Sequence, residues 1–191
     1  MDRHLLEDDK PSNYFISIDK PEFSSEFPFS MLNDLKITLQ SPVYHPEGTV
    51  WNHIMLVIDE AAQRRGNSSD ARAFMWAALL HDIGKKATTR SRKGKITSYN
   101  HDKLGSEMAR AFLGEFTQDK EMIKKVAALV RWHMQVLFVA KSTSLVDIKS
   151  MKEQTSIPDI ALLGLCDRLG RLDVDKEKEE KNIKTFLEIC S

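Results

Sequence analysis

Six ionisable side chains fall where helical patterns in the sequence place core residues. Four are histidines, out of only six in the chain, and two are aspartates. They are His53, His81, Asp82, His101, His133 and Asp167. An unpaired polar group in an apolar interior costs about 1 to 3 kcal/mol, and an unpaired charge costs more. Imidazole nitrogens and carboxylate oxygens are the usual ligands of Zn, Mn, Fe, Co and Ni. The set therefore predicts a site for a divalent transition metal.

Taken one at a time, these residues have ordinary structural explanations. A single histidine on an apolar stripe is more often a satisfied core or interface residue than a ligand, and Asp167 could cap a turn or be exposed. What favours a metal site is that four of the six histidines fall in register with core residues, each on a different expected helix. His4 lies in the N-terminal tail and His45 precedes a proline, so we set both aside.

Helices are the elements that must position these side chains. From Thr49 onward apolar residues recur at spacings of three and four, which is the period of an amphipathic helix. The expected helices run from Val50 to near Gly66 with His53, from the caps Ser69 and Asp70 to Gly84 with His81, from the cap Asn100 through His101 to Phe112, from the cap Asp119 through His133 to Leu137, and from Ser156 through Pro158 to Asp167. Side chains on facing helices of a bundle can converge on one point.

The adjacent pair His81 and Asp82 sets a geometric requirement. Neighbours on a straight helix diverge by about 100°, so both reach one ion most easily where the helix ends. Gly84 follows two residues later and supplies that ending.

Outside these helices the sequence predicts less regular structure. Residues 1–46 hold five of the six prolines and one short helical pattern, Met31 to Leu39; we expect an irregular arm packed on the body. Residues 47–191 are expected to form one all-α bundle, with a basic loop at 85–98 and no strand. The charged tail from Asp173 to Lys184 is expected to be a solvated helix whose Ile183, Leu187 and Ile189 dock on the body.

The composition limits the partners. The 28 basic and 28 acidic residues cancel, so no global field draws the chain to nucleic acid or to an anionic membrane. A phosphate ligand would have to be attracted locally. Two cysteines outside any CxxC pair, a charged N-terminus and the lack of a run of roughly 20 apolar residues fit a cytoplasmic protein.

The order of the site residues resembles the H…HD…H…D signature of the HD superfamily of metal-dependent phosphohydrolases. The local words HPEGTVWNHIMLVID, LLHDIGK, NHDKLGSEMA, VRWHM and CDRLGR are similar to the HD domain attached to some bacterial tRNA nucleotidyltransferases. The likeness runs from about His45 to Arg171. The nucleotidyltransferase head of those enzymes is missing, so tRNA end-building is not implied, and we expect an HD module that stands alone.

The resemblance implies roles for single residues. His53, His81, Asp82 and Asp167 match the ligands of a first metal, while His101 and His133 match those of a second ion, with Asp82 able to bridge. Lys85 matches a lysine that lies close to the substrate phosphate, and Arg168 is a further candidate for binding it. Lys86 and the loop cations Arg90, Arg92, Lys93 and Lys95 could form a rim around the substrate or simply be solvated.

The expected activity is hydrolysis of a phosphomonoester or phosphodiester by a metal-activated water, with one or two ions of Fe, Mn, Ni, Co or Zn. The expected substrate is a small phosphorylated molecule such as a nucleotide, or an RNA end. Two alternatives stay open: a di-iron oxygenase of the same fold, and a non-catalytic module that senses a nucleotide.

Overall fold

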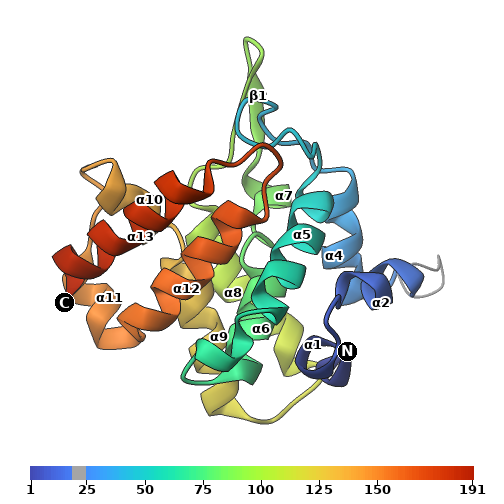
Figure 1. Cartoon of the computed structure of the whole chain (residues 1–191). Helices are drawn as coiled ribbons and strands as arrows, with labels where there is room; N and C mark the ends of the chain where they lie inside the picture. The colour runs from blue at the N-terminus through green and yellow to red at the C-terminus, as the bar shows by residue number, and fades with distance from the viewer. Residues whose placement is uncertain (19–24) are drawn as a thin grey trace.

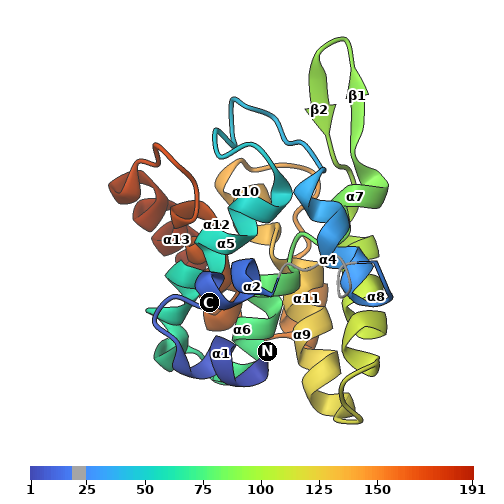
Figure 2. The same ribbon diagram turned by 90° about the vertical axis from the view of Figure 1, so that its right-hand side faces the viewer.

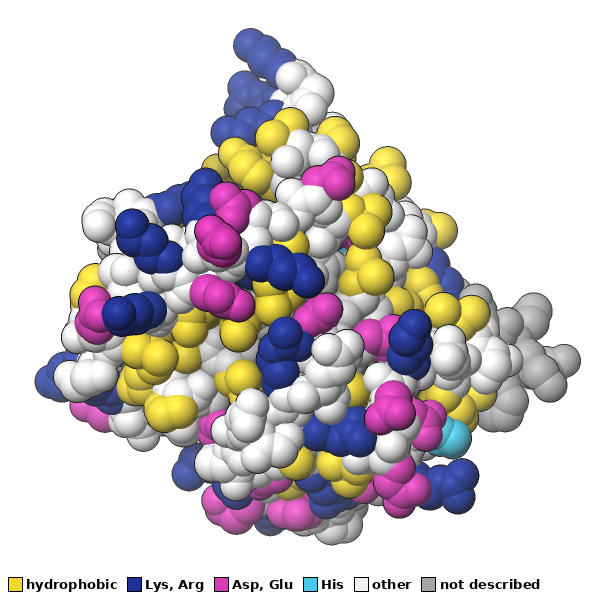
Figure 3. Space-filling view, in the orientation of Figure 1, with side chains coloured by type: hydrophobic (Ala, Val, Ile, Leu, Met, Phe, Trp, Pro, Cys, Tyr) yellow, Lys and Arg dark blue, Asp and Glu magenta, His cyan; other side chains and the backbone are white. Residues whose placement is uncertain are grey.

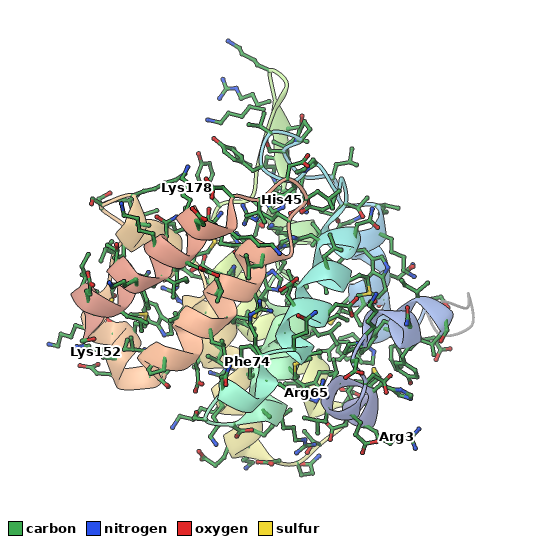
Figure 4. The ribbon with its side chains drawn as sticks, viewed as in Figure 1. Arg3, His45, Arg65, Phe74, Lys152 and Lys178 are labelled. Carbon is green, nitrogen blue, oxygen red and sulfur yellow. The ribbon has the colours of Figure 1, made fainter. Side chains whose placement is uncertain are left out.

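Five helices form the body of the molecule in the computed structural model, which describes residues 1–18 and 25–191. They are α5 (Val50–Ala62), α6 (Ala71–Leu80), α8 (His101–Gly114), α9 (Lys120–Trp132) and α12 (Ile157–Leu169). Helix α9 packs on α8 and α6, and α12 packs on α5 and α6. Fully buried side chains such as Phe74, labelled in the middle of Figure 4, fill the space between them. The expected all-α bundle is confirmed.

Short polar side chains start these helices where the sequence predicts them. The side chains of Asp70, Asp119 and Ser156 each accept a hydrogen bond from a backbone N–H in the first turn of α6, α9 and α12. Such bonds satisfy donors that the helix itself leaves free. Asn100 also precedes its helix, but it has a left-handed φ of 62° and makes no side-chain cap.

The N-terminal arm is more helical than its prolines suggest. Its described part contains α1 (Asp2–Glu7), α2 (Ser12–Ser17) and α4 (Phe29–Lys36), whereas the sequence predicts only a helix near Met31 to Leu39. Residues 19–24 of the arm lie outside the described residues. The arm packs on α5 and α6, and the indole of Trp76 donates to Asp2 at 2.7 Å.

The expected basic loop at 85–98 folds differently. It consists of a short helix, α7 (Lys85–Thr88), and an antiparallel hairpin of β1 (Arg90–Arg92) and β2 (Lys95–Thr97). Figure 2 shows the hairpin projecting from the bundle. Lys93 and Gly94 form its two-residue turn, with φ of 50° and 74°. Strands of three residues are too short for a visible alternation, which explains why the sequence gives no sign of them.

The C-terminal third adds three helices to the bundle, and they lie together at one side of it (Figure 1). They are α10 (Gln135–Ala140), α11 (Ile148–Gln154) and α13 (Lys176–Cys190). A single turn of 3-10 helix, Arg65–Asn67, follows α5. The helix expected to run from Asp119 to Leu137 is therefore two helices, which meet at His133 and Met134.

Helix α13 docks on α10 and α12 much as predicted, with one correction. Ile183 and Leu187 pack against the core, but Ile189 is 53% exposed. The buried positions are Phe186 and Cys190, one turn apart. Ile189 directly precedes Cys190, so it points about 100° away from this stripe. Among all the described helices, none is both long and apolar enough to cross a membrane.

Candidate metal centre

The HD pair lies just beyond the end of α6. That helix ends at Leu80, and His81 occupies its C-cap, so the prediction that the pair marks a helix end is confirmed. The prediction that Gly84 ends this helix is wrong. Its φ is −74°, not left-handed, and a Cβ there would meet backbone atoms of His101 and Gly105 on α8. Gly84 therefore lets α8 approach the HD turn closely.

Three histidine rings are fixed in the same way. The Nδ1 atom of each lies at hydrogen-bond distance from the carbonyl oxygen three residues earlier. The pairs are His81 with Ala78 (2.9 Å), His101 with Ser98 (2.6 Å) and His133 with Val130 (2.7 Å). A carbonyl oxygen only accepts, so Nδ1 carries the proton and Nε2 keeps a lone pair. This is how proteins orient histidines that bind metals.

Asp82 lies between two pairs of histidines. Its Oδ2 is 3.3 Å from Nε2 of His81 and 3.9 Å from Nε2 of His53. Its Oδ1 is 3.4 Å from Nε2 of His101 and 3.8 Å from Nε2 of His133. The two oxygens of one carboxylate thus face two separate donor pairs. All of these side chains are buried.

Asp167 and a chain of polar groups complete the His53 side. Oδ1 of Asp167 lies 3.0 Å from Nε2 of His53. On the other edge of the ring, Nδ1 lies 3.0 Å from Oε1 of Glu47, an ion-pair distance without the geometry of a good hydrogen bond. His45 makes a hydrogen bond of 2.8 Å through its Nδ1 to the same Glu47 oxygen. His45, which we set aside in the sequence, therefore adjoins the site.

The site is electrostatically prepared for positive charge. Burial alone would raise the pKa of Asp82, but Lys85 and His81 outweigh it and hold that pKa well below the ordinary value. Burial would likewise raise the pKa of Asp167, but Arg171 and His53 hold that pKa well below its ordinary value. Burial would lower the pKa of His81, yet the charges of Asp82 and Asp167 raise it. Both carboxylates are thus anionic, and they attract a cation.

His133 shows the opposite behaviour. Burial, with further repulsion from His101 and His81, lowers its pKa to about 3. The pKa of His101 is also lowered, first by burial. Both rings are neutral at neutral pH, which is the form that binds a metal.

Lys85 and Arg168, the two cations expected to bind the substrate phosphate, lie at this site together with Arg171, whereas the loop cations Lys86, Arg90, Arg92, Lys93 and Lys95 do not line the cavity. Nζ of Lys85 is 2.6 Å from Oδ2 of Asp82 and donates to Oε1 of Gln40, also at 2.6 Å. Nε of Arg168 lies 3.9 Å from Oε2 of Glu179. Arg171, not predicted, donates to Asp167 at 2.9 Å. Its only signal in the sequence is its position one helical turn after Asp167.

These groups open into a cavity of about 850 Å³. Its wall includes Asp82, His101, His133 and Asp167 from the site, and the cations Lys85, Arg131, Lys141, Arg168 and Arg171. A cavity of this size accommodates a nucleotide. His45, labelled below the hairpin in Figure 4, also lines it.

The donor set fits a divalent transition metal. Three groups of buried residues could each hold an ion, because within each group the ligand atoms lie within 4.8 Å of one another. The groups are His45 with Glu47 and His53, His53 with His81 and Asp82, and Asp82 with His101 and His133. Nε2 of His81 is buried without a hydrogen-bond partner among the described residues. Such an atom is costly unless something else occupies its lone pair. Five of the six predicted side chains belong to these groups, and the sixth, Asp167, lies 3.0 Å from Nε2 of His53.

Comparison with known proteins agrees with this geometry. The family model of the HD domain matches residues 45–179. The chain is 35% identical over 106 residues to the CC-adding tRNA nucleotidyltransferase of Thermus thermophilus, a match that covers 54% of this chain and 24% of that protein. It is 32% identical over 121 residues to the A-adding tRNA nucleotidyltransferase of Deinococcus radiodurans, covering 62% and 27%.

A multifunctional CCA protein of Alkalilimnicola ehrlichii is 25% identical over 140 residues, which is 70% of this chain and 32% of that protein. The chain thus spans about a sixth to a third of the length of the relatives that it matches. The expected likeness to the HD domain of these enzymes is confirmed. Because the family model covers more than half of the chain, the chain belongs to the HD domain family, a superfamily of metal-dependent phosphohydrolases.

Proposed function

We propose that this chain hydrolyses a phosphate ester of a nucleotide or of an RNA end with the help of one or two divalent transition-metal ions. The observation that carries the proposal is the position of Asp82. Its two oxygens face different histidine pairs, as a carboxylate that bridges two ions would. Ions about 3.5 to 4 Å apart are typical of two-metal phosphoesterases.

The ligands are assigned from this arrangement. In the proposal, His53, His81, Asp82 and Asp167 hold the first ion. His101 and His133 hold the second, and Asp82 is shared. When bound, such ions polarise phosphoryl oxygens and acidify water, which supplies hydroxide at neutral pH. The carbonyl partners of the three Nδ1 atoms keep each Nε2 directed at the centre.

The surrounding cations are proposed to hold the substrate. Lys85 is buried and adjoins both Asp82 and the cavity, so its ammonium group can neutralise a phosphate that arrives beside Asp82. Lysine serves this task as a compact point charge. Arg168 lines the same cavity, and its pairing with Glu179 is long enough to be exchanged for a phosphate. Arg171 holds Asp167 in place through their hydrogen bond.

The relatives support the choice of substrate class. They are named tRNA nucleotidyltransferases, and the HD domain occupies residues 45–179 of this chain. A nucleotide or RNA phosphate is therefore the first substrate to test.

The cations weigh against the first rival, and the complete set of ligand positions weighs against the second. An oxygenase acting on an uncharged substrate has no need of Lys85, Arg168 and Arg171 in its cavity wall. A sensor with a degenerate site would lack ligands, whereas all six positions are filled here. An oxygen electrode with iron-loaded protein would detect the first rival.

The test uses Asp82→Asn, which keeps the shape of the side chain and removes its charge. We expect it to lose bound metal, measured by elemental analysis, and to lose hydrolysis of a panel of phosphomonoesters and phosphodiesters. Its helicity should stay the same. Asp34→Asn on α4 is the matched control, since Asp34 does not line the cavity and its Oδ1 lies 3.7 Å from Nζ of the exposed Lys86. Full activity and full metal content in Asp82→Asn would refute the proposal.

A further inference from the structure

The segment after the HD pair concentrates positive charge. Six cations and no acidic residue lie between Lys85 and His101, in a chain whose charges cancel overall. They are Lys85, Lys86, Arg90, Arg92, Lys93 and Lys95. Figure 3 shows Lys and Arg side chains gathered on the projecting hairpin. The last three, Arg92, Lys93 and Lys95, are exposed.

These cations occupy positions that make the hairpin less stable. Arg92 is directly opposite Lys95 in the β1–β2 register, so both point to the same face, and like charges opposite each other destabilise a strand pair. Lys93 has a φ of 50°, in a turn of two positive-φ residues where Asn would be preferred. These cations therefore lower the stability of the hairpin. A surface that binds an anion is expected to keep such charges in spite of this cost.

The hairpin leads directly into the cavity of the proposed active site. Ile96 of β2 and the following residues Ser98, Tyr99 and Asn100 line that cavity. Arg90, Arg92, Lys93 and Lys95 are not among the lining residues. A mononucleotide confined to the cavity would not reach them. A ligand that uses both must continue beyond the cavity mouth and cross the hairpin.

Two aromatic side chains stand at this mouth. Tyr99 is 73% exposed and Tyr44 is 61% exposed, although both line the cavity. Nζ of Lys141 lies 5.7 Å from the ring centre of Tyr44. Exposed aromatic rings beside cations are what a single strand of nucleic acid requires, because its bases stack on the rings while its phosphates pair with the cations.

We propose that the β1–β2 hairpin is a docking arm for single-stranded nucleic acid, whose terminal phosphate enters the cavity. This inference rests on the proposed phosphohydrolase function, and it narrows the substrate from any nucleotide to the end of a strand. Arg92, Lys93 and Lys95 bind successive backbone phosphates. Tyr99 and Tyr44 stack the bases next to the reacting end.

The test replaces the three cations without straining the hairpin. In the variant Arg92→Gln/Lys93→Asn/Lys95→Gln the like-charge pair is gone and the turn becomes Asn-Gly, so its melting temperature should equal or exceed that of the wild type. The control Lys120→Gln/Lys124→Gln/Lys149→Gln removes three exposed cations at the start of α9 and on α11. Lys120 is 13 residues before His133, about 20 Å along the helix.

The probe is a 5′-fluorescein RNA of about 12 nucleotides with a 3′-phosphate. Anisotropy in the presence of a chelator measures binding without turnover, and phosphate release measures turnover. We expect the hairpin variant to bind RNA at least about tenfold more weakly, with the slope of log K against log salt reduced by about 2, because each backbone contact to a single strand contributes about 0.7. The control should bind RNA like the wild type. Hydrolysis of p-nitrophenyl phosphate should be similar in all three proteins.

Three results would overturn the docking arm. One is unchanged RNA binding by the hairpin variant, and another is an equal loss in the control. The third is loss of binding to phosphatidylserine vesicles with RNA binding unchanged, which would assign the hairpin to an anionic lipid surface. Failure of the proposed function gives a different pattern: no phosphoester is cleaved with any metal, while RNA binding still depends on the hairpin, and the docking arm then stands without the hydrolase.

Discussion

The close approach of the HD turn to α8 leads to a sharp prediction for Gly84→Ala. A Cβ at Gly84 would meet the carbonyl oxygen of His101, and it would lie 2.7 Å from the backbone N and 3.0 Å from the Cα of Gly105. These are backbone atoms of α8, which a rotamer change cannot move. The substitution must therefore push α8 away from the turn that carries His81 and Asp82.

The magnitude follows from the kind of contact. Overpacking a well-packed core costs about 1 to 3 kcal/mol, and contact with backbone on both sides places Gly84→Ala at the upper end, about 3 kcal/mol. In a chain of this size each kcal/mol lowers the melting temperature by about 2 to 4 °C, so we expect a loss of about 6 to 12 °C. His101 begins α8, so its Nε2 should retreat from Asp82 and the second proposed ion should bind more weakly than the first.

The assays are thermal unfolding followed by circular dichroism, and titration of the folded variant with a divalent metal. Gly114→Ala is the matched control, because it lies at the end of α8 and a Cβ there meets nothing within 4 Å. Replacing a helical glycine by alanine stabilises by up to about 1 kcal/mol. If the free energy of unfolding of Gly84→Ala were within about 0.5 kcal/mol of the wild-type value, the two backbones could not lie as close together as the structure places them.

Three further outcomes are expected. Asp70→Ala removes the N-cap of α6 and should lower stability by about 1 kcal/mol in thermal unfolding; an unchanged melting temperature would contradict the cap. Glu47→Gln removes the carboxylate beside His53 and should weaken metal binding by about 10- to 100-fold in a competition titration, with unchanged affinity as the contrary result. Burial raises the pKa of Cys166 to about 12 and also raises that of Cys190. Both thiols should therefore react with a disulfide reagent at mildly alkaline pH only after denaturation, and fast reaction of the folded chain would show that one is accessible.

Residues on regular helices were predictable because their position follows from spacing. His53, His133 and Asp167 share stripes with apolar residues, and a helix that packs on a core by one face brings everything on that face inward. The caps Asp70, Asp119 and Ser156 could be read for a similar local reason, since each needs only its own side chain and the next turn of backbone.

The hairpin and the neighbours of His53 and Lys85 lie in segments without a periodic pattern: the strands have three residues each, and Glu47 and Gln40 lie in a loop. Residues 38–50 are folded by backbone bonds such as Gln40 N–H to Gly48 and Val50 N–H to Thr38. That loop brings Glu47 against His53 and Gln40 against Lys85. Neither side chain is part of a periodic pattern, so the sequence gives no reason to prefer either one.

For Lys85 the charge pattern and the family resemblance give different expectations: the pattern alone favours the surface, whereas the resemblance places it near the substrate phosphate, and the structure places it beside Asp82. As one of six cations in an acid-free run it looks like solvated surface, yet it is buried between Asp82 and Gln40, while Arg92, Lys93 and Lys95 a few residues later are fully outside. The short helix α7, which begins at Lys85, lies between Lys85 and the hairpin cations. Because one stretch of charge is divided between the cavity and the hairpin, a ligand with a single phosphate would use only its first part. A strand with several phosphates would use all of it, and the salt dependence of binding measures that difference.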